Sequence, residues 1–137
     1  MSPSLDNLSR ADIVNYRLEK SDSSLLAADV LASNKLFDSA VTRLYYACFH
    51  AASALLIQNN IECGSHAGVK RMLSLKFINT GLLDKKYIRY FSDLLNGRQL
   101  SDYEDFIYQN EESYSYYKGQ AVDFCNAIKK LILSSTL

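Results

Sequence analysis

Arg98 is the residue whose type and position most clearly suggest chemistry. It is followed four positions later by Asp102 and then by Tyr103. An arginine that continues an apolar helical stripe needs a carboxylate or an anionic ligand, because an unpaired buried charge is costly. Two interpretations follow: an Arg98–Asp102 ion pair that fixes this junction, or a guanidinium directed at phosphate, which its planar fork suits. The stripe that leads to Arg98 consists of Tyr87, Phe91 and Leu94.

Arg43, Tyr46 and His50 form a second polar group, on a segment that is otherwise almost wholly apolar. In a helix with 100° per residue, Arg43 and His50 point only about 20° apart and lie two turns from one another. They form a polar track, directed away from the apolar stripe that runs from Phe37 to Leu55 on the same segment. The track is either a satisfied internal hydrogen-bond network or a surface that faces a dimer cleft.

Tyrosine is abundant, with ten in the chain and several between Tyr103 and Tyr117. Aromatic faces beside basic groups can stack on nucleic-acid bases, and tyrosine is also a frequent anchor in protein interfaces. Tyr114 and Tyr117 fall on a helical core stripe, so we expect those two to pack internally.

Composition places these residues in one small domain. The chain has 137 residues, of which 48% are hydrophobic and 22% are charged, and this fits a single domain, 1–137, with a sizeable core. Residues 1–8 are expected to be a flexible tail, and nothing near the start resembles a signal peptide. The apolar stretch Ala47–Ile57 falls short of the roughly 20 residues that span a bilayer.

The three cysteines and the charge distribution narrow the function classes. An odd number of widely spaced cysteines without a CxxC pair indicates neither a zinc site nor a disulfide framework and favours reduced thiols in a cytoplasmic protein. We expect no metal and no cofactor. The formal net charge is zero, but residues 66–98 are mainly basic and residues 99–112 are acidic. The basic block could meet phosphates, or it could face its own acidic neighbour.

Hydrophobic periodicity predicts five helical segments. The patterns place them at about 9–33, 36–59, 65–79 and 84–98, with a last helix from about Tyr114 after a polar, acidic stretch. The second segment is apolar on most sides, which is typical of a central helix. Asn34-Lys35 and Thr80-Gly81 are expected to end helices, and Asp84 to cap one. We therefore expect an all-α, compact up-and-down bundle of four to five helices.

Three sequence runs together resemble the HEPN family (higher eukaryotes and prokaryotes nucleotide-binding). The run 40–52, Ala-Val-Thr-Arg-Leu-Tyr-Tyr-Ala-Cys-Phe-His-Ala-Ala, is similar to that family's second-helix signature. Ser65–Val69, followed by Phe77–Leu82, is similar to the third helix and turn of one small prokaryotic branch. Residues 98–103 match the Arg-Gln-x-x-Asp-Tyr motif of that branch. The similarity covers roughly residues 16–133.

The resemblance implies a helical bundle that is commonly a homodimer and, in active members, a metal-independent endoribonuclease. Those members use an Arg-x4–6-His motif, in which arginine holds the phosphate and histidine takes the 2′-hydroxyl proton. Arg98 matches the arginine, but Tyr103 occupies the histidine's place. Tyrosine, with a pKa near 10, is a poor base at neutral pH. His50 could substitute only if the fold brings it near Arg98.

The resemblance also implies a partner, because many small HEPN proteins pair with a minimal nucleotidyltransferase in a toxin–antitoxin system. In some pairs the transferase adds AMP to a tyrosine near the motif, a role that Tyr103 could take. The leading hypothesis is a module that pairs in this way and binds nucleotide or RNA phosphate through Arg98, with Asp102 and Tyr103 shaping the pocket. The alternatives are an active endoribonuclease using Arg98 with Tyr103 or His50, and a structural helical adaptor without a nucleotide site.

Overall fold

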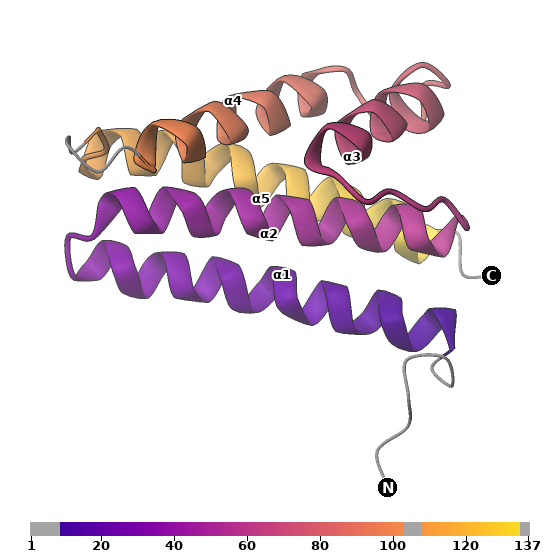
Figure 1. Ribbon diagram of the computed structural model, residues 1–137, viewed down its shortest axis with the longest axis horizontal. Helices are drawn as coiled ribbons and strands as arrows, with labels where there is room; N and C mark the ends of the chain where they lie inside the picture. Colours follow the sequence, from indigo (N-terminus) through magenta and orange to yellow (C-terminus); the bar gives the residue numbers. More distant parts are fainter. Residues whose placement is uncertain (1–8, 103–107, 135–137) are drawn as a thin grey trace, which may run out of the picture.

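The computed structural model describes residues 9–102 and 108–134, and these form helices with no strand among them. The expected tail, 1–8, lies outside the described residues. Figure 1 shows that the four long helices alternate in direction, as expected for an up-and-down bundle. The elements are α1 (Arg10–Ser33), α2 (Phe37–Gln58), α3 (His66–Leu73), η2 (Ser74–Ile78), α4 (Lys86–Ser101) and α5 (Glu111–Ser134).

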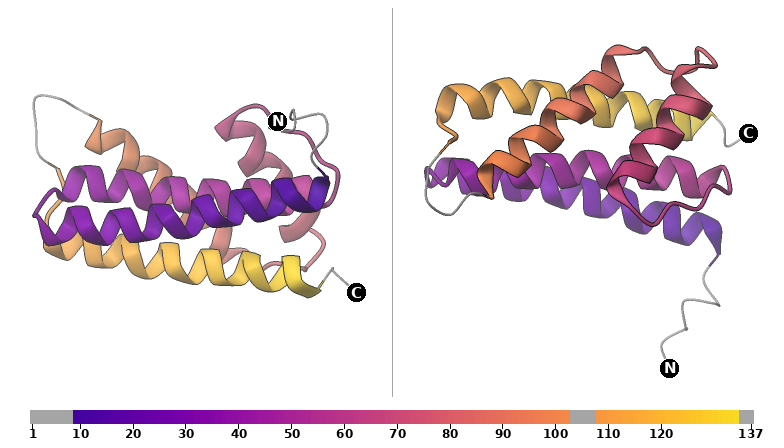
Figure 2. Two further views of the ribbon diagram at one scale, coloured as in Figure 1. Left: turned by 90° about the horizontal axis from the view of Figure 1, so that it is seen from below. Right: turned by 45° about the horizontal axis from the view of Figure 1, so that its top comes forward.

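Helix α2 is the centre of the bundle, as its apolar sequence predicts. It packs against α1, α4 and α5, and Figure 2 shows α4 crossing obliquely over it. Half of its residues are buried, among them Leu44, Tyr45 and Leu55. Ser21 of α1 donates a hydrogen bond of 2.8 Å to the Ala47 carbonyl, which ties the two helices together.

Helix α2 is longer than the apolar stretch Ala47–Ile57 noted in the sequence, so its length must be compared again with the thickness of a bilayer. By length and composition Phe37–Gln58 could cross a membrane, with a mean hydropathy of 1.3 in its most apolar window. In the bundle, 61% of that window is buried against other parts of the chain. Its apolar side chains therefore serve as the core of the bundle.

Local signals set most helix ends. Ser9 and Asp12 form a capping box at the start of α1, with Asp12 N donating to Ser9 Oγ at 3.1 Å. The expected break at Asn34-Lys35 is confirmed, since Lys35 has a φ of 61°. The expected glycine stop is also confirmed, because Gly81 has a φ of +80°, a region in which glycine carries no steric penalty. Asp84 Oδ1 accepts a hydrogen bond of 2.9 Å from Lys86 N at the start of α4.

Two predicted segments differ from the structure in detail. The segment 65–79 is not one regular helix, because α3 ends at Leu73 and continues as the π-helical turn η2. The last helix begins at Glu111 rather than Tyr114. Asn110 and Ser113 exchange backbone-to-side-chain hydrogen bonds of 2.9 Å in both directions. This reciprocal capping starts the helix within the polar, acidic stretch that was expected to precede it.

Two glycines provide a test of the packing between α4 and α5. A Cβ on Gly97 would lie 2.9 Å from Cζ of Tyr117, whereas a Cβ on Gly119 would meet nothing within 4 Å. We expect Gly119→Ala to raise the free energy of unfolding by about 0.5–1 kcal/mol through helix propensity. We expect Gly97→Ala to lower it by about 1 kcal/mol, because the Tyr117 ring must move. Urea unfolding of both variants measures this difference, and equal stabilisation by the two would contradict the close approach at Gly97.

Candidate functional site

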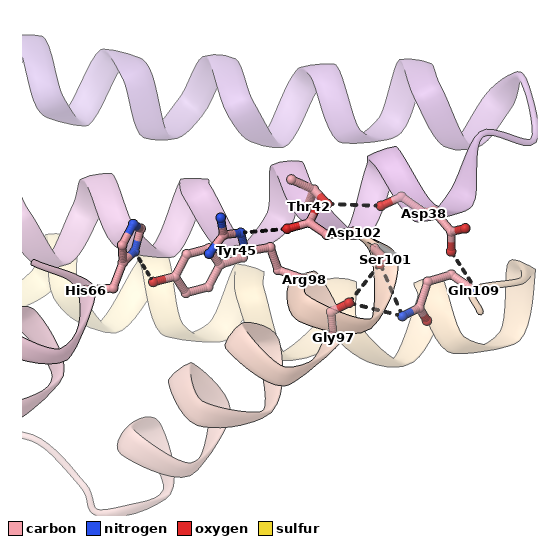
Figure 3. Close-up of polar contacts among 9 residues, drawn as sticks. All are labelled: Asp38, Thr42, Tyr45, His66, Gly97, Arg98, Ser101, Asp102 and Gln109. Carbon is pink, nitrogen blue, oxygen red and sulfur yellow. Dashed lines mark hydrogen bonds and ion pairs between the residues drawn. The ribbon is translucent and has the colours of Figure 1, made fainter. Parts of the chain in front are cut away.

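Arg98 lies in the last turn of α4, where the sequence stripe placed it. Its Nε is 3.5 Å from Asp102 Oδ2, so the predicted ion pair is confirmed (Figure 3). The Asp102 side chain is 55% exposed and that of Arg98 is 26% exposed. Nε is buried and has no hydrogen-bond partner among the described residues. Arg98 and Asp102 therefore attract each other electrostatically, but Nε of the guanidinium keeps an unused hydrogen-bond donor.

Two tyrosine rings of α2 support the Arg98 guanidinium. Its Cζ lies 5.9 Å from the centroid of Tyr45 and 5.5 Å from that of Tyr46. Cation–π attraction at such distances holds a guanidinium in place without neutralising its charge. Tyr45 is fully buried and packs on Phe91 of α4. The rings thus connect the position of Arg98 to the core.

His66, the first residue of α3, joins this group through Tyr45. Tyr45 Oη is 2.5 Å from His66 Nδ1, and the tautomer of the imidazole decides which of the two donates (Figure 3). Ser65 caps α3 by accepting a hydrogen bond from Gly68 N at 3.0 Å, which fixes the helix start. Phe49 packs on the imidazole with ring centroids 4.4 Å apart. Burial and, secondarily, the charge of Arg98 lower the pKa of His66 below its usual value. The imidazole is therefore neutral at neutral pH and can accept a proton.

Gln109 holds the end of α4 against the start of α2. Its backbone N donates to Asp38 Oδ1 at 2.8 Å, and its side-chain Nε2 donates to the Gly97 carbonyl at 3.3 Å (Figure 3). Ser101 Oγ also donates to that carbonyl, at 2.7 Å. These bonds fix the turn of α4 that carries Arg98.

The structure places the residues proposed from the sequence in two groups. Arg98, Asp102 and Tyr46 lie together, and Arg43 and His50 form the second group. Tyr103 is outside the described residues. Among the described contacts, none joins His50 to Arg98; the positive neighbours that act on His50 are Arg17, Lys20 and Arg43. The idea that His50 approaches Arg98 therefore receives no support, and His66 takes that place.

Sequence reasoning missed His66 and Tyr45 as members of the site. Their contact joins residues 21 positions apart, and it depends on how α3 packs on α2. The local signal was the serine that precedes the histidine, since Ser65 is a suitable N-cap residue. A capped helix start would place His66 on a first turn, but no periodicity in the chain says which helix that turn faces.

The family model described as the HEPN domain matches residues 14–132. The chain belongs to the HEPN family. Two similar proteins of Methanocaldococcus jannaschii carry the names "Putative toxin MJ0605" and "Putative toxin MJ0142". The first is 38% identical over 115 residues, which cover 84% of this chain and 85% of that protein. The second is 33% identical over 120 residues, or 88% of this chain and 82% of that protein.

A third relative of this HEPN protein is a UPF0332 protein of Thermotoga maritima. It is 31% identical over 120 residues, which cover 88% of this chain and 91% of the relative. The region that the family model matches includes α2, α3, α4 and the Arg98 site, together with most of α1 and α5. The resemblance read from residues 40–52, 65–82 and 98–103 is thus confirmed at the level of the family.

Proposed function

We propose that this HEPN protein is the toxin-type member of a toxin–antitoxin pair and binds the phosphate of an RNA or nucleotide through Arg98. The observation that carries the proposal is a partly exposed guanidinium that is supported by two tyrosine rings and, within the described part of the chain, paired only with an exposed aspartate. Such a group can exchange its carboxylate for a phosphate at little cost, because exposed ion pairs contribute little. The toxin names of two relatives support the biological role.

We further propose that the chain forms a homodimer and pairs with a minimal nucleotidyltransferase, as its family resemblance implies. Co-expression with a nucleotidyltransferase encoded beside it tests the pairing, and stable copurification is the expected result. Binding of a fluorescent single-stranded RNA, measured by anisotropy at two salt concentrations, tests the phosphate contact. Affinity should fall as salt rises, because phosphate contacts release counterions. An RNA affinity too weak to measure at low salt would overturn the phosphate proposal.

Asp102→Asn should strengthen phosphate binding. The Asp102 carboxylate lies beside Arg98 and repels a phosphate that approaches it, so its neutralisation should raise RNA affinity about twofold to fivefold, equivalent to roughly 0.4–1 kcal/mol. Anisotropy titration measures this change. Asp22→Asn is the matched control, because Asp22 forms a similarly exposed ion pair with Lys129 of α5. An equal gain from the control would indicate a general effect of net charge.

A second candidate function is metal-independent RNA cleavage, favoured by the position of His66. In this reaction the ribose 2′-oxygen attacks phosphorus, the P–O5′ bond breaks, and the 2′-hydroxyl proton passes to Nε2 of His66. This requires the tautomer in which Nδ1 carries the hydrogen and donates it to Tyr45 Oη. The products are a 2′,3′-cyclic phosphate and, once the leaving oxygen takes up a proton, a 5′-hydroxyl. A neutral imidazole suits this role. The test is cleavage of RNA in EDTA, which His66→Gln should abolish while RNA binding persists.

A further inference from the structure

A cavity between α1 and α2 holds the polar residues that the Arg98 site does not use. Its volume is about 470 Å³. Arg43 and His50 of α2 line it, facing Tyr16, Glu19 and Lys20 of α1. The polar track read from the sequence therefore borders a cavity formed with α1, separate from the last turn of α4.

The charges around this cavity are mostly positive and unneutralised. Lys20 and Arg43 line it, and Arg17 is close enough to act electrostatically on His50. Among the described residues, none of these three cations forms an ion pair with a carboxylate. Glu19 is the one carboxylate in the lining, and it likewise has no ion-pair partner in the described part of the chain. Three cations against the single carboxylate of Glu19 leave a net positive charge around the cavity, which favours an anion.

Tyrosine rings hold two of the cations at the cavity. Lys20 Nζ lies 5.5 Å from the ring centroid of Tyr16, and Arg43 Cζ lies 4.9 Å from that of Tyr46. Cation–π contacts of this kind order a long side chain and leave its hydrogen-bond donors available. Two ordered cations on neighbouring helices, one a guanidinium and one an ammonium, match the oxygens of a phosphate.

His50 lacks the internal hydrogen bond that would explain a histidine on a core helix. Its Nδ1 is buried without a partner among the described residues, whereas buried polar atoms in folded proteins are usually paired. Burial first, and then the charges of Arg17, Lys20 and Arg43, lower the pKa of His50 to about 4. The ring is therefore neutral at neutral pH, and it reports on the charge of anything that enters the cavity.

We propose that the α1–α2 cavity is a phosphate-binding site in which Lys20 and Arg43 hold the anion beside His50. It is a second site, distinct from the one at Arg98. The two are neighbours, because the Tyr46 ring lies within 6 Å of both guanidinium groups, Arg43 at 4.9 Å and Arg98 at 5.5 Å. The phosphate could therefore belong to a free mononucleotide or to the RNA strand engaged at Arg98. Only the second source rests on the function proposed above.

The test follows the NMR signals of His50 while inorganic phosphate or AMP is added. The chain has two histidines, so the His66→Gln variant assigns the signals. A bound phosphate should stabilise the imidazolium and raise the pKa of His50 by about 0.5–1 unit. Lys20→Ala should weaken phosphate binding at least fivefold, whereas Lys130→Ala, which removes an exposed lysine of α5, should leave it unchanged. A His50 response no larger than that to chloride at equal ionic strength would overturn the proposal, as would equal effects of the two lysine variants.

Two further arms distinguish the sources of the phosphate. If it belongs to a bound RNA strand, a short RNA shifts the His50 signal in the wild type, and both Lys20→Ala and Arg98→Ala reduce that shift. If it belongs to a free mononucleotide, AMP shifts the signal equally in the wild type and in Arg98→Ala, and RNA does not. Both outcomes support the cavity as a phosphate site, and silence toward both ligands refutes it. Silence here together with RNA binding that depends on Arg98 would leave the proposed function standing alone.

Discussion

Arg98→Ala should lower the affinity for a short single-stranded RNA by about tenfold to a hundredfold, the equivalent of the 1.5–3 kcal/mol that a hydrogen bond to a charged group contributes. The free energy of unfolding should change by less than about 1 kcal/mol, because the pair that is lost is partly exposed and poorly aligned. The two measurements, anisotropy titration and urea unfolding, separate a binding role for Arg98 from a structural one.

Two variants control for general effects of charge. Arg89→Ala removes an exposed cation from the same helix, one that also rests near a tyrosine ring, that of Tyr90, at 5.8 Å. It should reduce RNA affinity less than about threefold, as expected of a cation that only adds to the local potential. Arg98→Lys should fall between wild type and Arg98→Ala, since an ammonium keeps the charge but loses the planar fork. If Arg98→Ala destabilised the fold and bound RNA as tightly as Arg89→Ala, the structural adaptor would be the better description.

The features that could be predicted from sequence are those that depend on residues close together in the chain. The apolar repeat of α2 predicted a central helix because a helix that is apolar on most sides must be buried on most sides. The Arg98–Asp102 pair was predictable for a similar reason, since residues four apart on a helix are neighbours in space. Gly81 was predictable as a stop because few other residues adopt a positive φ so readily.

The features that could not be predicted depend on how helices meet. The hydrogen bond between Tyr45 and His66 joins α2 to α3, and no local pattern says which face of α2 receives α3. The same holds for the α1–α2 cavity, where Lys20 contributes a charge that sequence analysis of Arg43 and His50 did not include. The resemblance identified the motif at residues 98–103, which contains Arg98. The histidine near Arg98 is His66, and it belongs to the separate run Ser65–Val69.

His50 should make the fold less stable as the pH falls from neutral. Burial and three nearby cations lower its folded-state pKa from 6.5 to about 4. Below pH 6.5 the unfolded chain gains a proton at His50, while the folded protein does not gain one until about pH 4. Proton uptake therefore favours the unfolded state, and the stability that His50 contributes above pH 6.5 is lost progressively down to about pH 4. Burial lowers the pKa of His66 as well, so its contribution has the same sign.

The expected loss at His50 is about 1–2 kcal/mol, less than the full 1.36 kcal/mol per pKa unit, because solvent screens a partly exposed ring. Urea unfolding at several pH values in a phosphate-free buffer measures it. His50→Gln is the control, because glutamine stays neutral over this range and should remove that part of the pH dependence. Identical pH profiles for wild type and His50→Gln would contradict the environment assigned to His50.

Phosphate in the buffer should restore part of the lost stability in wild type but not in Lys20→Ala, because an anion in the α1–α2 cavity would offset the charge that an imidazolium adds there.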